Sequence, residues 1–282
     1  MAGSLEPMSI ASDSKALGSC TDVPQHGQRI RVSVVIPVKD DSIRLARCMA
    51  ALRRQTVLAD EIIVVDNASS DDSMLVARAA GATVIECSDP GIPAASSKGY
   101  DHARGEFILR LDADCIPPRS WIEDVVESFD ENPECSAFTG AARFIDGPAF
   151  LRAPLAIMYL SAYSMAAMPA LGHRPLFGSN LAMRRDAWQS VRAFIHRKDC
   201  ELHDDLDLSF HLGEQHKVSY LKSSAMGISM RPFKSGRAFW RRTYRGFRTV
   251  VIHWPHDFPP RRWRRLAAAS KARLALKERP AH

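Results

Sequence analysis

Two carboxylates stand close together in Asp112-Ala113-Asp114, directly after the apolar segment Phe107 to Leu111. Residues two apart on an extended segment project to the same side, so one ligand can meet both carboxylates. Hard oxygen ligands suit Mg²⁺ or Mn²⁺ bridging a diphosphate. An acidic turn that caps the following helix is the alternative. The position directly after a buried strand favours a metal site with Asp112 and Asp114 as its ligands.

A third carboxylate, Asp66, ends the apolar segment Glu61 to Val65. The polar residues that follow it include Ser70, Asp71 and Asp72, which can cap the next helix. Capping does not require an acid at Asp66. A carboxylate at the end of a strand can accept hydrogen bonds from a ribose or a base, so Asp66 is a candidate for nucleoside binding.

His253 and His256 are three residues apart and flank Trp254. One of them could complete a metal site or contact a diphosphate. No further ligand pattern supports the pair, which favours a surface or loop position for both histidines.

The segments that position these side chains alternate between two patterns. Continuous β-branched runs are typical of strands buried on both faces of a parallel sheet, and apolar residues at helical spacing lie between them. The predicted strands are 32–38, 61–65, 83–87, 107–111 and a short one near 137–142, and the predicted helices are 43–53, 73–80, 94–103 and 121–129. Strand, helix, strand in this order predicts a parallel α/β sheet. Asp66 and Asp112 should then lie at its carboxyl edge, where open α/β folds bind ligands.

The composition is that of a folded protein. With 282 residues, 46% of them apolar, the chain can build one large α/β domain or two small ones. The six cysteines include no CxxC pair, which argues against a disulfide framework or zinc knuckle and favours reduced thiols in a cytosolic protein. Residues 1–30 lack a basic start followed by an apolar run, so we expect a disordered leader and no signal peptide.

Basic residues are concentrated at the C-terminal end. Residues 231–282 hold 15 Lys or Arg against two acids, whereas the rest of the chain is acidic overall. Such a tail can meet phosphates of an anionic lipid, a lipid-diphosphate acceptor or nucleic acid. Arg231 to Arg248 interleaves aromatic and basic residues, as basic amphipathic surface helices do. The alternative is a helix that packs its aromatic side chains on the domain and leaves its arginines in water.

One uncharged segment, Ala153 to Gly172, is about as long as a membrane span. It is rich in alanine and contains two prolines, so hydropathy favours a buried or interfacial helix over a span.

The chain resembles the glycosyltransferase family 2 enzymes over about residues 31 to 221. The resemblance rests on five segments in the family's order and approximate spacing: VSVVIPVKDDSIRLARCMAAL, DEIIVVDNASSDDS, ARGEFILRLDAD, LFGSNLAMRRDAW and HDDLDLS. It implies the GT-A fold, a Rossmann-like, mostly parallel open sheet with helices on both faces, here followed by a basic helical C-terminal tail. The implied parts are a leader (1–30), a GT-A domain (31–230, with a nucleotide-sugar half 31–118 and an acceptor half 119–230) and the tail (231–282).

The resemblance also implies roles for individual residues of the donor half. Pro37 and Lys39 would line the base pocket, and Asp66 would contact the nucleoside. Asp112 would contact the ribose or the metal, and Asp114 the metal. The implied cofactor is Mn²⁺ or Mg²⁺, and the implied partner is a nucleotide-sugar donor.

On the acceptor side the segment Asp204-Asp205-Leu206-Asp207-Leu208 is similar to the family's acidic motif, with Asp204 in place of the usual Glu. By this resemblance Asp205 is the catalytic base, and Asp204 and Asn180 lie on the acceptor side. A base there would take the proton of the acceptor hydroxyl. The alternative is that the acids cap a helix running to Leu212.

The chain departs from the family pattern at two places. Where relatives commonly have Arg-Asn before a glycine, this chain has Ser96-Ser97-Lys98-Gly99, so an arginine contact to the donor is missing or is supplied by Lys98. Phe239-Trp240-Arg241-Arg242 does not match the QxxRW motif, which argues against a processive polysaccharide synthase.

We therefore expect a metal-dependent enzyme that transfers a single sugar, with inversion, to a hydroxyl of a glycan or lipid-linked acceptor in cell-surface or lipid-linked glycan synthesis. We expect a cytoplasmic protein, with an anionic membrane as a candidate partner of residues 231–265 at the inner face of the plasma membrane. Nucleic acid is not expected, because it leaves the acidic sites unexplained.

Other functions are open. One is a catalytically inactive relative that binds nucleotide or membrane. Another is a sugar-phosphate nucleotidyltransferase, although the glycine-rich basic loop typical of that class is replaced here by Pro37-Val38-Lys39-Asp40. A dinucleotide oxidoreductase is excluded because no GxGxxG opens the first helix.

Overall fold

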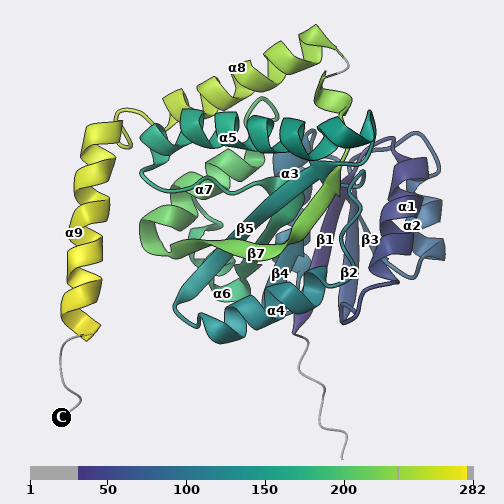
Figure 1. Ribbon diagram of the computed structural model, residues 1–282, viewed down its shortest axis with the longest axis horizontal. Helices are drawn as coiled ribbons and strands as arrows, with labels where there is room; N and C mark the ends of the chain where they lie inside the picture. The colour runs from purple at the N-terminus through teal and green to yellow at the C-terminus, as the bar shows by residue number, and fades with distance from the viewer. Residues whose placement is uncertain (1–30, 234, 278–282) are drawn as a thin grey trace, which may run out of the picture.

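The computed structural model describes residues 31–233 and 235–277; the expected leader, residues 1–30, lies outside them. Its centre is a seven-stranded sheet with the strand order β3-β2-β1-β4-β6-β5-β7 (Figure 1). The strands are β1 (Val32–Val38), β2 (Glu61–Asp66), β3 (Thr83–Glu86), β4 (Phe107–Arg110), β5 (Cys135–Phe144), β6 (Leu181–Arg184) and β7 (Lys217–Ile228).

Helices cover both faces of this sheet. One hydrophobic core joins the sheet to α1, α2 and α4, and a second core joins it to α3, α6 and α7. The helices are α1 (Ser42–Leu52), α2 (Ser73–Ala79), α3 (Ile92–His102), α4 (Trp121–Glu131), α5 (Arg152–Leu171), α6 (Arg185–Val191), α7 (Asp204–Gln215), α8 (Gly236–Ile252) and α9 (Pro259–Lys277). Short 3₁₀ turns lie at η1 (Ala149–Leu151), η2 (Gly178–Asn180) and η3 (Arg231–Phe233).

Most strand pairs are parallel, as expected. β1 pairs in parallel with β2 and β4, β2 with β3, and β5 with β7. β6 runs antiparallel to both of its neighbours, β4 and β5. The sequence did not lead us to expect β6 or β7. β6 has only four residues, too few for alternation or a β-branched run to mark it.

Close packing of α3 on the sheet depends on a glycine. A Cβ atom at Gly99 would lie 2.4 Å from Val35 Cγ1 in the middle of β1. The missing side chain therefore lets α3 approach the sheet closely. This contact fixes Ser96, one turn earlier on α3, relative to the edge of the sheet.

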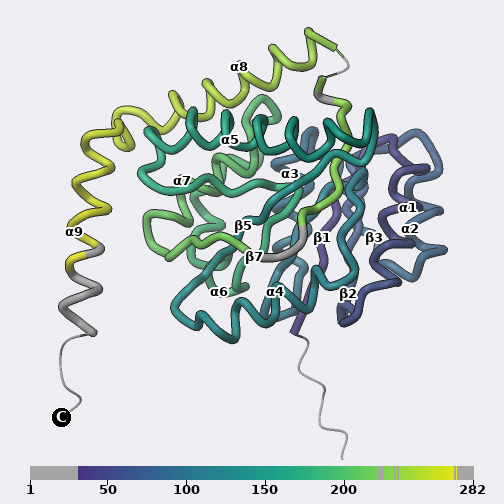
Figure 2. Tube along the Cα trace, viewed as in Figure 1, coloured from purple at the N-terminus to yellow at the C-terminus, as the bar shows by residue number. Residues whose placement is uncertain are grey.

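The basic C-terminal segment is helical, as expected. α8 lies across the molecule beside α5, and α9 then leads away from the domain (Figures 1 and 2). Buried polar contacts join this segment to the domain. Arg262 is fully buried and donates to the carbonyl oxygens of Leu171 and Phe210 at 2.6 and 2.7 Å. Thr249 of α8 accepts a hydrogen bond from the backbone N–H of His203, just before α7.

The expected buried or interfacial helix at 153–172 is α5, and only four of its 20 residues are buried. Its buried residues are Ala156, Ala167, Ala170 and Leu171. Its exposed apolar residues are Ile157, Met158, Met165 and Met168. Among the described residues, the continuous helix Ala149–Leu171 is long and apolar enough for a membrane crossing, a match in length and composition alone. The side chains rule out a fully buried core helix.

Candidate active site

The carboxyl edge of the sheet gathers the predicted donor residues. Asp66 is the last residue of β2 and stands opposite Val38 in the register of β1, with Lys39 following in solvent. Asp66 is 2% exposed, and its Oδ2 accepts the backbone N–H of Ser69 at 3.1 Å. Its Oδ1 is buried without a hydrogen-bond partner in the part of the chain that the structure describes. A buried acceptor left unpaired is costly, so this atom suits a ligand that donates a hydrogen bond.

Asp112 follows β4 and is held by two donors. Arg110 Nη2 donates to Asp112 Oδ1 at 2.8 Å, and Ser179 Oγ donates to Oδ2 at 2.5 Å. Arg110 is itself buried and lies 3.3 Å from Asp204 Oδ2, so its guanidinium links the end of β4 to the start of α7. A Cβ at Gly178 would lie 1.3 Å from Arg110 Nη1, so only glycine leaves room for this guanidinium.

Asp114 faces an arginine from the C-terminal part of the chain. Arg231 Nη2 lies 2.6 Å from Asp114 Oδ2 and 2.7 Å from Asp41 Oδ2, so one guanidinium stands between two carboxylates. Burial and the charge of Asp112 raise the pKa of Asp114, although Arg231 opposes them. Positive charge at this position therefore stabilises the ionised carboxylates.

The donor atoms beside Asp114 fit a hard divalent ion. Asp112, Asp114 and Cys115 can each offer a ligand atom, and these atoms lie within 4.8 Å of one another. Burial and the neighbouring carboxylates raise the pKa of the Cys115 thiol well above its ordinary range, so it stays protonated. The two carboxylates remain, and oxygen ligands suit Mg²⁺ or Mn²⁺. An ion bound by Asp114 would have to share this carboxylate with Arg231 or displace it.

Asp204 and Asp205 open α7 and have opposite surroundings. Asp205 Oδ2 accepts the backbone N–H of Gly178 at 2.9 Å, and its Oδ1 lies 2.7 Å from His203 Nδ1. Burial alone would raise the pKa of Asp205, but His203, Arg110 and the Gly178 N–H outweigh it and hold this pKa below its usual range. Asp204 accepts a hydrogen bond from Ser96 Oγ at 3.1 Å. Burial, together with the charge of Asp205, raises the pKa of Asp204 despite Arg110.

Three predicted site residues have other neighbours. Pro37 is buried within β1. Lys98 donates from its Nζ to the carbonyl oxygen of Glu86 at 2.6 Å, at the end of β3. Asn180 accepts a hydrogen bond from Trp121 Nε1 at 2.9 Å and donates to the carbonyl oxygen of Ala141 at 3.0 Å, so both ends of its amide hold the fold together.

Several residues that contact the carboxylates were not predicted, among them Ser96, Arg110, Ser179, His203 and Arg231. Arg110 had a local signal, because a charged residue inside a buried strand requires a partner. Ser179 lies 67 positions from Asp112, and Arg231 lies 117 positions from Asp114. Nothing local in the sequence marks contacts of that kind.

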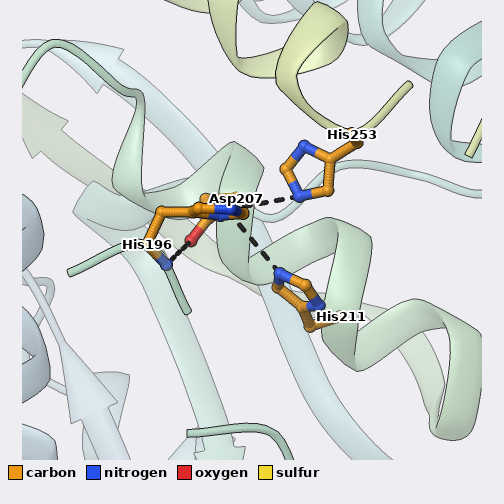
Figure 3. A group of neighbouring side chains, drawn as sticks. All are labelled: His196, Asp207, His211 and His253. Carbon is orange, nitrogen blue, oxygen red and sulfur yellow. Dashed lines mark hydrogen bonds and ion pairs between the residues drawn. The ribbon is translucent and has the colours of Figure 1, made fainter. Parts of the chain in front are cut away.

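The two C-terminal histidines differ from one another. His256 is exposed, as expected, with 75% of its side chain in solvent. His253 lies in the turn after α8, but a surface position is wrong for it, because its side chain is only 3% exposed. It lies beside His196, Asp207 and His211 (Figure 3).

An open, mostly parallel α/β sheet with an acidic pair after β4 and a second acidic pair at the start of α7 is the arrangement expected of the GT-A fold. The chain belongs to glycosyl transferase family 2, since the family's sequence model matches residues 33–192.

A curated relative is the undecaprenyl-phosphate 4-deoxy-4-formamido-L-arabinose transferase of Klebsiella pneumoniae. It is 38% identical over 115 residues, which cover 36% of this chain and 34% of the relative. The chain thus spans about a third of the length of the curated relatives that it matches.

Two solved structures share the fold. The mannosyltransferase PcManGT from Pyrobaculum calidifontis, in complex with GDP-Man and Mn²⁺, is 19% identical and matches with a TM-score of 0.59 over 88% of this chain and 76% of its own. Glucosyl-3-phosphoglycerate synthase from Mycobacterium tuberculosis, in complex with Mn²⁺, uridine-diphosphate and phosphoglyceric acid, is 17% identical and matches with a TM-score of 0.57 over 80% of this chain and 78% of its own.

Proposed function

We propose that this protein transfers one sugar from a nucleotide-diphosphate sugar to a hydroxyl acceptor, with inversion at the anomeric carbon and with a divalent metal. The carrying observation is the line of carboxylates along one edge of the sheet. Asp66 offers a buried oxygen at the end of β2 that has no hydrogen-bond partner among the described residues, and Asp112 and Asp114 follow β4. Across Arg110, Asp204 and Asp205 face this edge from α7.

The donor half supplies binding groups. Asp66 Oδ1 would accept a hydrogen bond from the nucleoside. Asp112 and Asp114 would hold Mn²⁺ or Mg²⁺, which supplies positive charge to the departing diphosphate when bound. The solved neighbours bind GDP-Man or uridine-diphosphate with Mn²⁺, which supports this part of the proposal.

The acceptor half supplies the proton acceptor. The acceptor hydroxyl oxygen forms a bond to the anomeric carbon while the bond from that carbon to the diphosphate oxygen breaks. Asp205 takes the proton of the hydroxyl, and displacement from the opposite side inverts the carbon. Its lowered pKa keeps Asp205 ionised at neutral pH, and its bonds to Gly178 and His203 fix its orientation.

Arginines neutralise the charge that the site collects. Arg110 is buried between Asp112 and Asp204. Arg231, between Asp41 and Asp114, is half exposed and belongs to a short 3₁₀ turn after β7. When an ion takes its place, the guanidinium would be free to contact the donor diphosphate.

We propose a lipid-linked or cell-surface glycan as the acceptor and the cytoplasmic, inner face of the plasma membrane as the location. The Klebsiella pneumoniae relative is an undecaprenyl-phosphate 4-deoxy-4-formamido-L-arabinose transferase, which supports a lipid-linked acceptor. The surface of α5 and α8 adds an independent argument. Ile157 and Met165 of α5 are exposed, as are Trp240 and Phe247 of α8, and Arg242 of α8 donates to Tyr159 of α5 at 2.8 Å. Aromatic and basic residues on one surface suit an anionic interface.

Calorimetry with the purified full chain tests the donor half without knowledge of the acceptor. UDP, GDP and TDP are titrated with Mn²⁺ and then with EDTA. We expect one nucleotide to bind and EDTA to weaken its binding. The matched variants are Asp114→Asn, expected to lose the metal-dependent part, and the exposed Asp130→Asn, expected to bind as wild type.

A folded protein that binds none of the nucleotides would contradict the proposal. Binding without turnover of any nucleotide sugar, over a panel of lipid-phosphate and glycan acceptors, would favour the inactive relative. A nucleotidyltransferase would instead release pyrophosphate from a nucleoside triphosphate and a sugar phosphate.

A further inference from the structure

Three histidines and an aspartate from distant segments meet behind α7. His196 lies in the loop after α6, Asp207 and His211 lie one turn apart on α7, and His253 follows the last residue of α8. Figure 3 shows the three rings arranged around the carboxylate of Asp207. Each residue offers one ligand atom, and the four atoms lie within 4.8 Å of one another. The cluster lies outside the donor and acceptor sites, which do not use it.

One oxygen of Asp207 is shared by all three rings. Asp207 Oδ2 accepts the backbone N–H of His196 at 2.9 Å. Oδ1 lies 2.7 Å from His196 Nδ1, 3.3 Å from His253 Nε2 and 3.7 Å from His211 Nε2. The hydrogen bond to His196 gives Oδ1 one donor. This bond does not explain why His253 Nε2 and His211 Nε2 also lie close to the same oxygen.

The hydrogen bond made by Nδ1 of His253 shows that this ring nitrogen carries a proton. His253 Nδ1 lies 2.7 Å from the carbonyl oxygen of Thr249, which can only accept, so Nδ1 carries the proton. In the neutral ring Nε2 then directs a lone pair toward a buried carboxylate oxygen. Nε2 of His253 and Nε2 of His211 are both buried without a hydrogen-bond partner in the described parts of the chain. A cation at the centre would bind both of these Nε2 atoms in their neutral rings and would pair with the Asp207 carboxylate.

The ligand set and its surroundings match a closed site for a transition metal. A tetrahedral zinc ion with bonds of about 2.0–2.2 Å separates its ligand atoms by about 3.4 Å, close to the spacings around Asp207 Oδ1. Metal-binding histidines usually donate their second N–H to a backbone carbonyl, as His253 does to Thr249. His196 would lose its Nδ1 proton on binding, as metal ligands do. It is 36% exposed, which leaves an entry path.

We propose that His196, Asp207, His211 and His253 bind one zinc ion or a similar nitrogen-binding divalent metal, as a second, structural site distinct from that of Asp112 and Asp114. Four protein ligands leave no open position for substrate, which is typical of structural zinc. The ion would join the end of α8 to α7. Because Asp207 is two residues from Asp205, it would also fix the turn of α7 that carries the proposed base.

The experiment uses the full chain without a histidine tag. The protein is stripped with a chelator, incubated with zinc, desalted and analysed for metal by mass spectrometry. We expect about one tightly held zinc per chain, as for structural sites with four ligands. The double variant Asp112→Asn, Asp114→Asn should retain the same amount. His253→Ala and His211→Ala should each weaken zinc binding by more than the roughly 10–100-fold typical of second-shell losses, and His256→Ala, which changes an exposed histidine, should not.

Cobalt provides a measurement that does not depend on variants. Co²⁺ added to the stripped wild type should give the intense visible bands of four-coordinate cobalt with nitrogen and oxygen ligands, and zinc should abolish them. This spectrum decides the question if the histidine variants do not fold. A wild-type chain that retains no zinc and gives only the weak bands of six-coordinate cobalt would overturn the proposal, as would zinc binding that is lost in the Asp112, Asp114 variant and kept in His253→Ala.

Discussion

The two faces of α7 place the same residue type in two different chemical environments. Toward the sheet edge, Asp204 and Asp205 meet the guanidinium of Arg110, the hydroxyl of Ser96 and the backbone N–H of Gly178. On the other face, less than one turn later, Asp207 meets three imidazole rings.

The partners of these acids decide what each face can bind. The first face has hydrogen-bond donors, such as Arg110, beside the carboxylate oxygens of Asp112 and Asp114. It therefore suits a hydroxyl substrate near a hard ion. The second face has three imidazole rings around a carboxylate, and imidazole nitrogens suit a transition metal. Both Asp205 and Asp207 have pKa values below the usual range, although burial acts in the opposite direction at each. A lowered pKa alone therefore does not distinguish a catalytic base from a metal ligand.

The largest expected effect comes from removing the carboxylates of Asp205 and Asp207 in separate variants. Asp205→Asn should lower kcat by about 10²–10⁴-fold, the usual contribution of a general base, and should leave nucleotide binding intact. Asp207→Asn keeps this base and removes a proposed zinc ligand, so it should release zinc and lower the thermal midpoint with a smaller change in kcat. Steady-state rates, nucleotide titration and thermal unfolding of both variants test the contrast.

Asp204→Asn is the matched control for the assignment of the base. It removes an acid from the same helical turn without touching His203 or the Gly178 N–H. If Asp204 only contacts the acceptor, the Asp204→Asn substitution should change KM more than kcat. A loss of kcat in Asp204→Asn that exceeds the loss in Asp205→Asn would move the base to Asp204.

The pH dependence of kcat sharpens the same comparison. A base works only when it is deprotonated, so kcat falls as pH drops through the pKa of the base. The pKa of Asp205 is lowered, so with Asp205 as base kcat should show no loss from this group down to mildly acidic pH. The pKa of Asp204 is raised, so with Asp204 as base the loss would begin at a higher pH.

The measurement is kcat at saturating donor and acceptor in overlapping buffers, with thermal unfolding at each pH to exclude loss of fold. Asp204→Asn provides the control, because it should leave the dependence of kcat on acidic pH, here called the acid limb, as it is in the wild type. An acid limb that disappears in Asp204→Asn would contradict the assignment of Asp205.

Local sequence patterns predicted the donor half well. All seven residues of β1 are buried, so its β-branched run carried the signal of a central strand. β2 and β4 ended within a residue of the expected positions, which placed Asp66 and Asp112 at the edge of the sheet. Strand period and strand ends are local properties, and for this reason they could be read from the sequence.

The partners of these acids could not be predicted in the same way. Ser96 and Asp204 are 108 positions apart, and Arg231 and Asp114 are 117 apart. Such pairs depend on how α3, α7 and η3 pack together, which no spacing along the chain encodes. A surface or loop position was expected for His253 because no ligand pattern nearby in the sequence supported it, and its partners His196 and Asp207 precede it by dozens of residues. The histidine cluster forms because α8 packs against α7, and this contact has no local signal in the sequence.

The smallest expected effect concerns a third surface, the exposed aromatic and basic face of α8. Trp240 is 70% exposed, and a Trp at a membrane interface can insert its ring while neighbouring arginines meet anionic lipid. Each basic residue near an anionic surface contributes about 1 kcal/mol, which corresponds to about fivefold in binding. Arg237→Gln should therefore weaken binding to vesicles rich in anionic lipid by about that factor, and Trp240→Ala should weaken it by a similar or larger one.

Two substitutions far from α8 provide the controls for this surface. Arg54→Gln in the exposed turn after α1 changes the charge by the same amount, and Leu75→Ala on α2 removes another exposed apolar side chain. Flotation with anionic and with neutral vesicles at low salt compares all four variants with the wild type. If the wild type ignores anionic vesicles, or if Arg54→Gln weakens binding as much as Arg237→Gln, α8 is not a membrane surface. Its aromatic residues would then belong to contacts with a protein partner, and the acceptor need not be lipid-linked.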